Sequence, residues 1–175
     1  MKSFNIDEAI QILETTPGVL NALLLNLPEG WADSREGPDT WSPYDIVGHL
    51  IHGEKTDWIL RMQMILEEGS SKPFPDFDRQ AQFRESKGKS LSQLLVQFEE
   101  LRKKNIGELK RQQLTESDFG KTGHHPDFGE VTLQQLLSTW VVHDLGHLRQ
   151  IARVLAKQYK DEIGPWENYL PVVSE

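Results

Sequence analysis

The chain has 175 residues, of which 37% are hydrophobic and 26% are charged, and its formal net charge at pH 7 is −8. These values predict one folded domain spanning residues 1–175. The acidic balance argues against nucleic acid as a partner, because such binding depends mostly on Lys and Arg neutralising phosphates. The sequence contains no cysteine, which excludes disulfides, thiolate metal sites and a cysteine nucleophile.

The sequence gives no sign of export or of membrane insertion. The N-terminal stretch "MKSFNIDEAIQILETT" carries charges where a signal peptide would have an uninterrupted apolar segment. No apolar run approaches the roughly 20 residues that are needed to cross a bilayer. We therefore expect a cytoplasmic protein without a membrane partner.

The first two long helices are predicted for residues 6–27 and 43–68, where apolar residues recur at helical spacing. Pro17 is expected to kink or interrupt the first of them. The second has a strong start signal: Ser42 is a good N-cap, Pro43 occupies the first helical position, and Asp45 lies in the first turn. Residues 69–89 form a long connection, with one short helix expected around residues 77–84.

The third and fourth helices are predicted for residues 90–114 and 132–159, the last one capped by Thr132. The basic cluster Arg102-Lys103-Lys104 is interpreted as a solvated helix face. Residues 115–131 are expected to be irregular, and no stretch of the chain shows the alternation typical of a strand. The C-terminal segment "IGPWENYLP" is expected to pack back as a tail.

Four amphipathic helices in one domain predict an all-α fold, a four-helix bundle with long loops at one end. The second and third connections exceed the usual bundle loop of about 2–8 residues. Such loops often cover the end of a bundle or line a pocket.

Two histidines of the fourth helix, His143 and His147, are four residues apart on its apolar face. That face also carries Leu133, Leu136, Leu137, Trp140, Ile151, Val154 and Leu155. Histidines at this spacing can ligate one metal ion. Two core histidines that are hydrogen-bonded to carbonyls or to water would show the same pattern, so the pair alone leaves both interpretations open.

A third histidine, His49, lies on the second helix, which can face the fourth in a bundle. Three imidazoles from two helices would leave one coordination position of a metal open, as catalytic sites do. Nitrogen ligands suit Zn, Ni, Fe or Cu better than Mg or Ca. His52, three residues further on, is interpreted as a surface or rim histidine, with a fourth ligand or an orienting group as the alternative.

Several further residues are near the predicted ligands in sequence or could reach them. Glu54 and Asp144 are candidate catalytic residues that could orient an imidazole or act as a general base, with solvated carboxylates as the alternative. Asp45 is interpreted as a capping residue. His124 and His125, in the loop before the last helix, are expected to be exposed unless that loop lies over a substrate. The tryptophans Trp41, Trp58 and Trp140 are interpreted as packing residues.

The segment "WSPYDIVGHLIHGE", followed by "HHPDFGEVTLQQLLSTWVVHDLGHLRQIARVLAKQY", resembles the DinB-like (DinB/YfiT-like) superfamily over nearly the whole chain. The resemblance implies a bundle with up-down-down-up connectivity. It also implies a divalent metal, zinc or nickel in most cases with iron or manganese as further options, held at positions that match His49, His143 and His147. Members often form homodimers. Known activities in the superfamily are thiol-dependent, and many members are labelled as hydrolases.

Two functions from different classes are consistent with these residues. The first is a metal-dependent enzyme that activates water or a low-molecular-weight thiol, for hydrolysis or S-transfer on a small-molecule substrate. The second is a non-catalytic bundle that a metal stabilises and that acts as a stress-related binding protein. A set of metal-free core histidines is the third interpretation.

Overall fold

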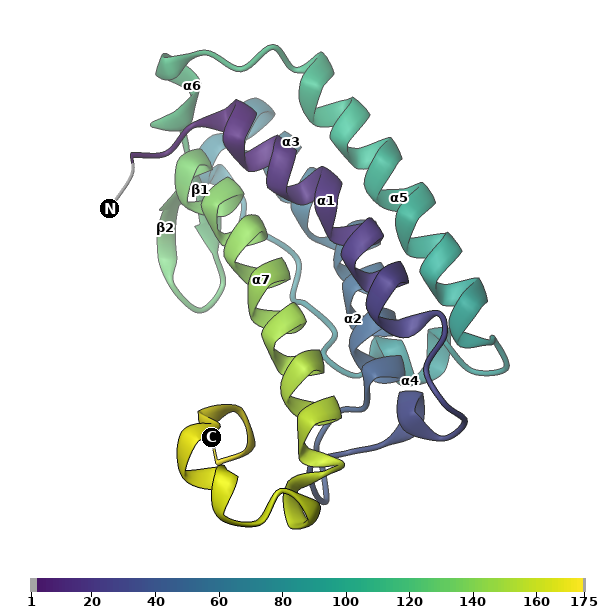
Figure 1. The fold of residues 1–175 in the computed structure, drawn as a ribbon. Helices are drawn as coiled ribbons and strands as arrows, with labels where there is room; N and C mark the ends of the chain where they lie inside the picture. The colour runs from purple at the N-terminus through teal and green to yellow at the C-terminus, as the bar shows by residue number, and fades with distance from the viewer. Residues whose placement is uncertain (1–2, 175) are drawn as a thin grey trace.

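A computed structural model describes residues 3–174, and long helices packed side by side dominate it (Figure 1). The bundle consists of α1 (Ile6–Leu24), α2 (Pro43–Thr56) with its continuation α3 (Trp58–Glu67), α5 (Leu91–Arg111) and α7 (Leu133–Lys157). The connections carry α4 (Ala81–Glu85), α6 (Glu116–Phe119) and the short 3-10 turns η1 (Trp31–Asp33) and η2 (Gly69–Ser71). None of the helices in residues 3–174 combines the length and the apolar character that a bilayer span requires.

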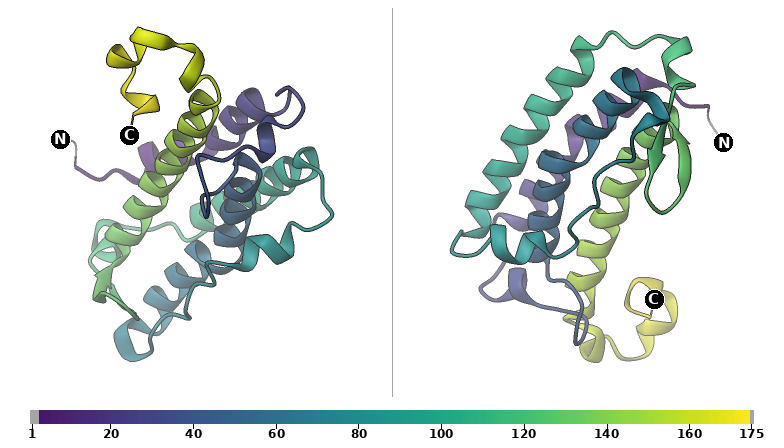
Figure 2. Two further views of the ribbon diagram at one scale, coloured as in Figure 1. Left: turned by 90° about the horizontal axis from the view of Figure 1, so that it is seen from below. Right: turned by 180° about the vertical axis from the view of Figure 1, so that it is seen from behind.

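The four-helix bundle and its up-down-down-up connectivity are as predicted. Figures 1 and 2 show α1 and α7 running in one direction and α2, α3 and α5 in the other. Helix α1 packs against α5 and α7. Helix α7 also packs against α2 and α3, and α2 packs along α5. Because α2–α3 and α5 are parallel, residues 68–90 must travel back along the length of the bundle before α5 can begin.

Side-chain caps fix where three of the long helices begin. Ser42, Ser90 and Thr132 each accept a hydrogen bond from the backbone N–H three residues later. In each case the side chain at that later position returns a bond to the cap backbone, which completes a capping box. The predicted caps Ser42 and Thr132 and the capping role of Asp45 are therefore confirmed.

The predicted second helix is divided in two. The chain leaves helical geometry at Asp57, whose φ and ψ are −115° and −77°, and α3 starts at Trp58. The indole of Trp58 approaches the backbone of α2 closely, since a Cβ at Gly53 would lie 3.3 Å from the Trp58 Nε1. The glycine therefore makes room for the tryptophan at this break. The short helix of the following connection is α4, shifted towards the C-terminus of the predicted range.

The expectation of no strand was wrong. Strands β1 (Thr122–His125) and β2 (Gly129–Thr132) form an antiparallel hairpin before α7. Each has only four residues, too few for a clear alternation of polar and apolar side chains. The hairpin is packed closely onto the bundle, because a Cβ at Gly123 would lie 2.6 Å from Phe74 and 2.7 Å from Ile65.

The C-terminal segment consists of the 3-10 turns η3 (Lys160–Glu162), η4 (Gly164–Tyr169) and η5 (Pro171–Val173). The last of them, η5, contacts α7, and Val173 is buried there. The chain thus returns to α7 at η5, whereas most of the predicted segment 163–171 is exposed, including Trp166 and Tyr169.

Of the two effects expected of Pro17, a kink or an interruption, the interruption does not occur, since α1 continues through this residue. A proline has no N–H for the carbonyl four residues earlier, here that of Leu13. That carbonyl instead accepts a hydrogen bond of 2.8 Å from Nη1 of Arg102 on α5. The arginine supplies the donor that the proline lacks, and this bond ties α1 to α5.

Arg102 is therefore not part of a solvated face, and the interpretation of the basic cluster was wrong at this position. Its side chain is 2% exposed and bridges two carboxylates. Nη2 lies 2.8 Å from Oε1 of Glu54 on α2, and Nη1 lies 2.6 Å from Oδ2 of Asp144 on α7. Lys103 and Lys104 are exposed, as expected. Only the arginine points into the bundle.

Every remaining hydrogen bond of this buried ion cluster also joins two helices. Thr16 on α1 donates to Asp144 at 2.7 Å, and on the other side Trp140 and Asn105 donate to Glu54 at 3.1 and 3.0 Å. Burial, the largest influence, raises the pKa of Glu54, although the neighbouring Arg102 acts in the opposite direction. Paired in this way, the buried charges avoid the desolvation cost of isolated ions.

The ion cluster forms a polar layer between two apolar halves of the bundle core. One half contains Leu13, Trp58, Leu109 and Trp140, and the other contains Leu20, Leu50, Phe98 and Ile151. On each long helix the polar residue comes between the residues of these two halves. A shift of any helix by one turn would bury apolar side chains against charges, so the layer fixes the register of the helices.

Replacing the arginine tests this layer. Arg102→Met should lower the free energy of unfolding by about 3–5 kcal/mol, because two buried carboxylates lose their counter-charge. Urea denaturation followed by circular dichroism measures the loss. The matched control is Lys103→Met, the exposed neighbour, which should stay within about 0.5 kcal/mol of the unmodified chain. Equal losses in the two variants would contradict a special role for Arg102.

Candidate metal centre

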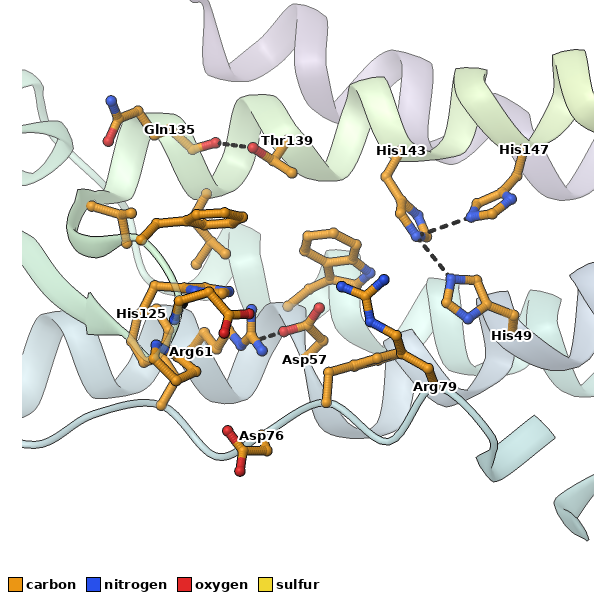
Figure 3. Close-up of a pocket in the computed structure, with 18 of the residues that line it drawn as sticks. His49, Asp57, Arg61, Asp76, Arg79, His125, Gln135, Thr139, His143 and His147 are labelled. Atoms are coloured by element: carbon orange, nitrogen blue, oxygen red, sulfur yellow. Dashed lines mark hydrogen bonds and ion pairs between the residues drawn. The ribbon is translucent and has the colours of Figure 1, made fainter.

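Three histidine rings meet between α2 and α7 (Figure 3). Nε2 of His143 lies 3.1 Å from Nε2 of His49 and 3.1 Å from Nε2 of His147. The potential ligand atoms of the three residues all lie within 4.8 Å of one another. The structure thus brings together the residues that the sequence singled out from two separate helices.

Helix geometry and aromatic packing place the three rings. His143 and His147 are one turn apart on α7, and His49 lies opposite them on α2. Trp41 lies against two of the rings, with its centroid 4.8 Å from that of His49 and 6.2 Å from that of His147. Trp58 meets His143 edge-on at 5.1 Å. Trp41 and Trp58 therefore orient histidines as well as filling space, whereas Trp140 is a core residue as predicted.

His49 is buried, whereas the inward placement of His143 and His147 that periodicity predicts is realised only in part. His143 and His147 are partly exposed, and the fully buried residue on this part of α7 is Asp144. On this part of α7, the side chains of Trp140 and Asp144 are the ones buried in the core. The two imidazoles lie at its edge, where they face a cavity.

The environment holds the three imidazoles in their neutral form. Burial, followed by the nearby His147, lowers the pKa of His49 from 6.5 to about 3, and the same two causes lower the pKa of His143 to about 3. Burial also lowers the pKa of His147, against the effect of its bond to Gln150. A neutral imidazole has a free lone pair on one nitrogen, which is the form that binds a metal.

The donor atoms fit a transition-metal ion. Zn–N bonds of about 2.0–2.1 Å at tetrahedral angles put ligand nitrogens roughly 3.3 Å apart, close to the observed separations. Nδ1 of His147 lies 2.9 Å from Oε1 of Gln150, an oxygen that only accepts hydrogen bonds, so Nδ1 carries the proton and Nε2 of His147 keeps its lone pair.

Without a cation the same arrangement satisfies its polar atoms poorly. The Nε2 of His143 has one proton or one lone pair for two close neighbours. Within residues 3–174, the buried Nδ1 atoms of His49 and His143 have no hydrogen-bond partner. One cation would use all three Nε2 lone pairs at once, so the residues present fit the metal that the resemblance implies.

The three histidines form part of the wall of a cavity of about 650 Å³. The cavity lies between α2–α3, α7, the β1–β2 hairpin and the connection formed by residues 68–90. Its aromatic wall consists of Trp41, Trp58, Phe74, Phe77 and Phe128. This volume suits a small organic molecule.

The other predicted histidines have different positions. His52 is buried rather than on the surface, and its Nδ1 lies 3.1 Å from Oε1 of Glu85, apart from the three-histidine cluster. The side chain of His124 is exposed, as expected. His125 lines the cavity and stacks on Phe128 with 4.4 Å between ring centroids, so it can touch a bound molecule.

Glu54 and Asp144, the candidate catalytic residues, are next to the metal centre in sequence but do not line the cavity. Their exposed fractions are 4% and 0%, and both carboxylates are bound to Arg102. The cavity instead presents Asp57, Arg61 and Arg79, which the sequence analysis did not single out. The spacing of Asp57 and Arg61 by four residues on a helix was the signal that could have identified that pair.

Comparison with known proteins identifies the family and supports the fold. The family model described as DinB superfamily matches residues 12–151. A protein of Bacillus cereus (strain AH820), named "Putative metal-dependent hydrolase", is 27% identical over 148 residues, which cover 83% of each chain. A protein of Bacillus anthracis (strain CDC 684) with the same name matches equally well.

Two solved structures are similar in fold. The structure of YfiT from Bacillus subtilis, described as "a probable metal-dependent hydrolase with an unusual four-helix bundle topology", aligns with a TM-score of 0.73 and 23% identity over 90% of this chain and 91% of that one. TT2238, described as a four-helix bundle protein, aligns with a TM-score of 0.60 and 20% identity over 85% of this chain and 98% of that one. Because the family model spans most of the sequence, this chain belongs to the DinB superfamily.

Proposed function

We propose that the chain is a metal-dependent hydrolase of small molecules, with His49, His143 and His147 as the metal ligands. The observation that carries this proposal is the convergence of three neutral Nε2 atoms on the wall of a cavity. The names of the Bacillus relatives agree with it. Zinc and nickel are the ions that we expect first, with iron or manganese as alternatives.

A divalent ion at this position supplies a Lewis acid and lowers the pKa of a bound water, so that a nucleophile exists near neutral pH. The chain itself supplies three uncharged ligands, a cavity of limited volume and aromatic walls that exclude bulk water from a substrate. Since all three histidines line the cavity, a substrate there can reach the ion.

S-transfer from a low-molecular-weight thiol, a homodimeric assembly and a cytoplasmic location stay predictions. The same cavity could hold a thiol, and the absence of cysteine from the chain means that a thiol would come as a co-substrate. The non-catalytic alternative, a bundle stabilised by its metal, predicts metal binding without turnover. Assays for hydrolysis and for thiol transfer on one metal-loaded preparation separate the three possibilities.

A catalytic role for Glu54 and Asp144 also stays a prediction, and their contacts favour a positioning role. Both carboxylates are saturated by hydrogen bonds from Arg102 and from residues around it. Asp144 is adjacent to His143 on α7, and Glu54 is on the same helix as His49. By locking α2 against α7, the ion cluster holds the ligands on the two helices at a fixed separation.

The metal content of the chain purified without a histidine tag should be about one transition-metal ion per chain, and His143→Ala should reduce it to background. His143 has close contacts to both other ligand atoms, so its removal leaves two donors. Inductively coupled plasma mass spectrometry measures the content. His124→Ala, which removes an exposed histidine outside the cluster, is the matched control and should keep the ion. A metal-free wild-type chain would refute the proposal.

The stability of the metal-free chain should rise with pH between about 3 and 6.5. The pKa values of His49 and His143 are about 3 in the folded chain and near 6.5 when unfolded, so the unfolded chain binds more protons in this window. The stabilisation is complete above the unfolded pKa and is lost as the pH falls towards 3. Urea titrations at several pH values measure it, and His143→Gln should show a smaller slope. Identical slopes in the two proteins would contradict the assignment.

Chelation should abolish hydrolysis, and the metal should restore it. A panel of small aryl esters and amides, followed by absorbance of the released phenol or aniline, provides the assay. His147→Ala should lose at least about 100-fold in kcat/KM through loss of a ligand. His124→Ala should retain the wild-type rate. Hydrolysis that survives both chelation and His147→Ala would show that the metal centre does not carry the activity.

A further inference from the structure

A second feature of the cavity is a buried arginine that is not fully paired. Arg61 on α3 is 7% exposed, and its Nε forms an ion pair with Asp57 one turn earlier. Its guanidinium lies over the ring of Phe74, 5.3 Å from the centroid. Within residues 3–174, Nε of Arg61 is a buried atom without a hydrogen bond, whereas its Nη atoms are not among the buried unpaired atoms and so are open to the cavity. Guanidinium donors that are open to a cavity can bind a ligand or water there.

A second arginine approaches the same space from the other wall. Arg79 belongs to the connection of residues 68–90, lines the cavity and has no ion pair within the part of the chain that is described. Figure 3 shows its guanidinium directed towards Asp57, between that carboxylate and the three histidines. Its charge is also one of the smaller influences that lower the pKa of His49. The two cations therefore face one compartment next to the metal centre.

The cavity also contains carboxylates, which could cancel this positive charge. The carboxylate of Asp57 is already engaged by Arg61. Asp76 and Asp127 are exposed, and in Figure 3 the carboxylate of Asp76 lies away from the other labelled side chains. Water screens exposed charges strongly, whereas a buried guanidinium keeps most of its field. Arg61 is therefore the buried cation of the cavity, and Arg79, which is exposed like Asp76 and Asp127, adds a positive charge close enough to His49 to influence its pKa.

We propose that Arg61 and Arg79 bind an oxyanion group of the substrate, a carboxylate or a phosphate, while the aromatic wall holds an apolar body. The planar fork of an arginine matches both anions through paired hydrogen bonds. This inference rests on the proposed function in one respect, since it assigns the anion to the substrate of the metal centre. It narrows that substrate to a small amphiphilic acid.

Matched ligands of one shape test the charge preference directly. Naphthalene-2-carboxylate carries the anion, and naphthalene-2-carboxamide is its neutral counterpart. Isothermal titration calorimetry on the metal-loaded chain should give a Kd for the carboxylate at least about ten-fold lower than for the carboxamide, as expected for charge-assisted hydrogen bonds. Naphthalene-2-phosphonate replaces the carboxylate in a parallel series, and the tighter of the two anions identifies the group.

Substitutions of the arginines show whether they, rather than the metal, bind the anion. Arg79→Gln should reduce the ten-fold ratio to below about three-fold. Arg61→Gln alone would leave Asp57 buried without its partner, so the double variant Asp57→Asn with Arg61→Gln is used, and the same reduction is expected. Arg84→Gln is the matched control: Arg84 is exposed, is paired with Asp78 and lies outside the cavity wall. It should keep the wild-type ratio.

The result also has to be distinguished from anion binding to the metal. In His143→Ala, which lacks the complete ligand set, the preference for the anion should persist and should still fall when Arg79 is replaced. A ratio near one in the wild-type chain would overturn the inference. So would a ratio that both arginine variants retain but His143→Ala loses, because the anion would then be a metal ligand. A metal-free wild-type chain that prefers the carboxylate would refute the hydrolase and leave the anion site standing.

Discussion

The contact between Arg102 and its two buried carboxylates is the constraint on which the rest of the structure depends. One guanidinium binds Glu54 on α2, Asp144 on α7 and the Leu13 carbonyl on α1, while belonging to α5 itself. All four long helices therefore meet at one side chain. Such ion networks do not usually add much net stability, but a partner that is missing is costly, so they favour one helix register over all others.

The candidate metal centre depends on that register because its three histidines are neighbours of the ion cluster. His143 precedes Asp144 on α7, and His49 lies just over one turn before Glu54 on α2. The polar layer, in which charges neutralise one another, thus lies inside the core. The neutral imidazoles lie beside it, at the edge of the core, where they face a cavity. Rigid support of this kind is what a metal site requires, since small errors in ligand position weaken binding.

Local signals in the sequence predicted much of this arrangement, and long-range contacts account for what they missed. Helix caps, the 3.6-residue period and three histidines are local features, and they identified the bundle, its helix starts and the three histidines that the fold brings together. The continuity of α1 through Pro17 depends on a donor from Arg102, far away in sequence. Arg102 lies four residues from both Phe98 and Ile106, a spacing that Lys103 lacks, but this local signal does not identify the distant carboxylates that it binds. The hairpin and the role of Arg79 likewise depend on which segments the fold brings together.

The long return of residues 68–90 is a geometric necessity of two parallel neighbouring helices, yet it also builds one side of the cavity, through Phe74, Phe77 and Arg79. This strip of chain is separate from the two helices that carry the three histidines. Insertions and substitutions in that strip can change chemical preference while leaving the core intact. In such a fold, the residues that line the cavity can change in evolution with little effect on the stability of the helical core.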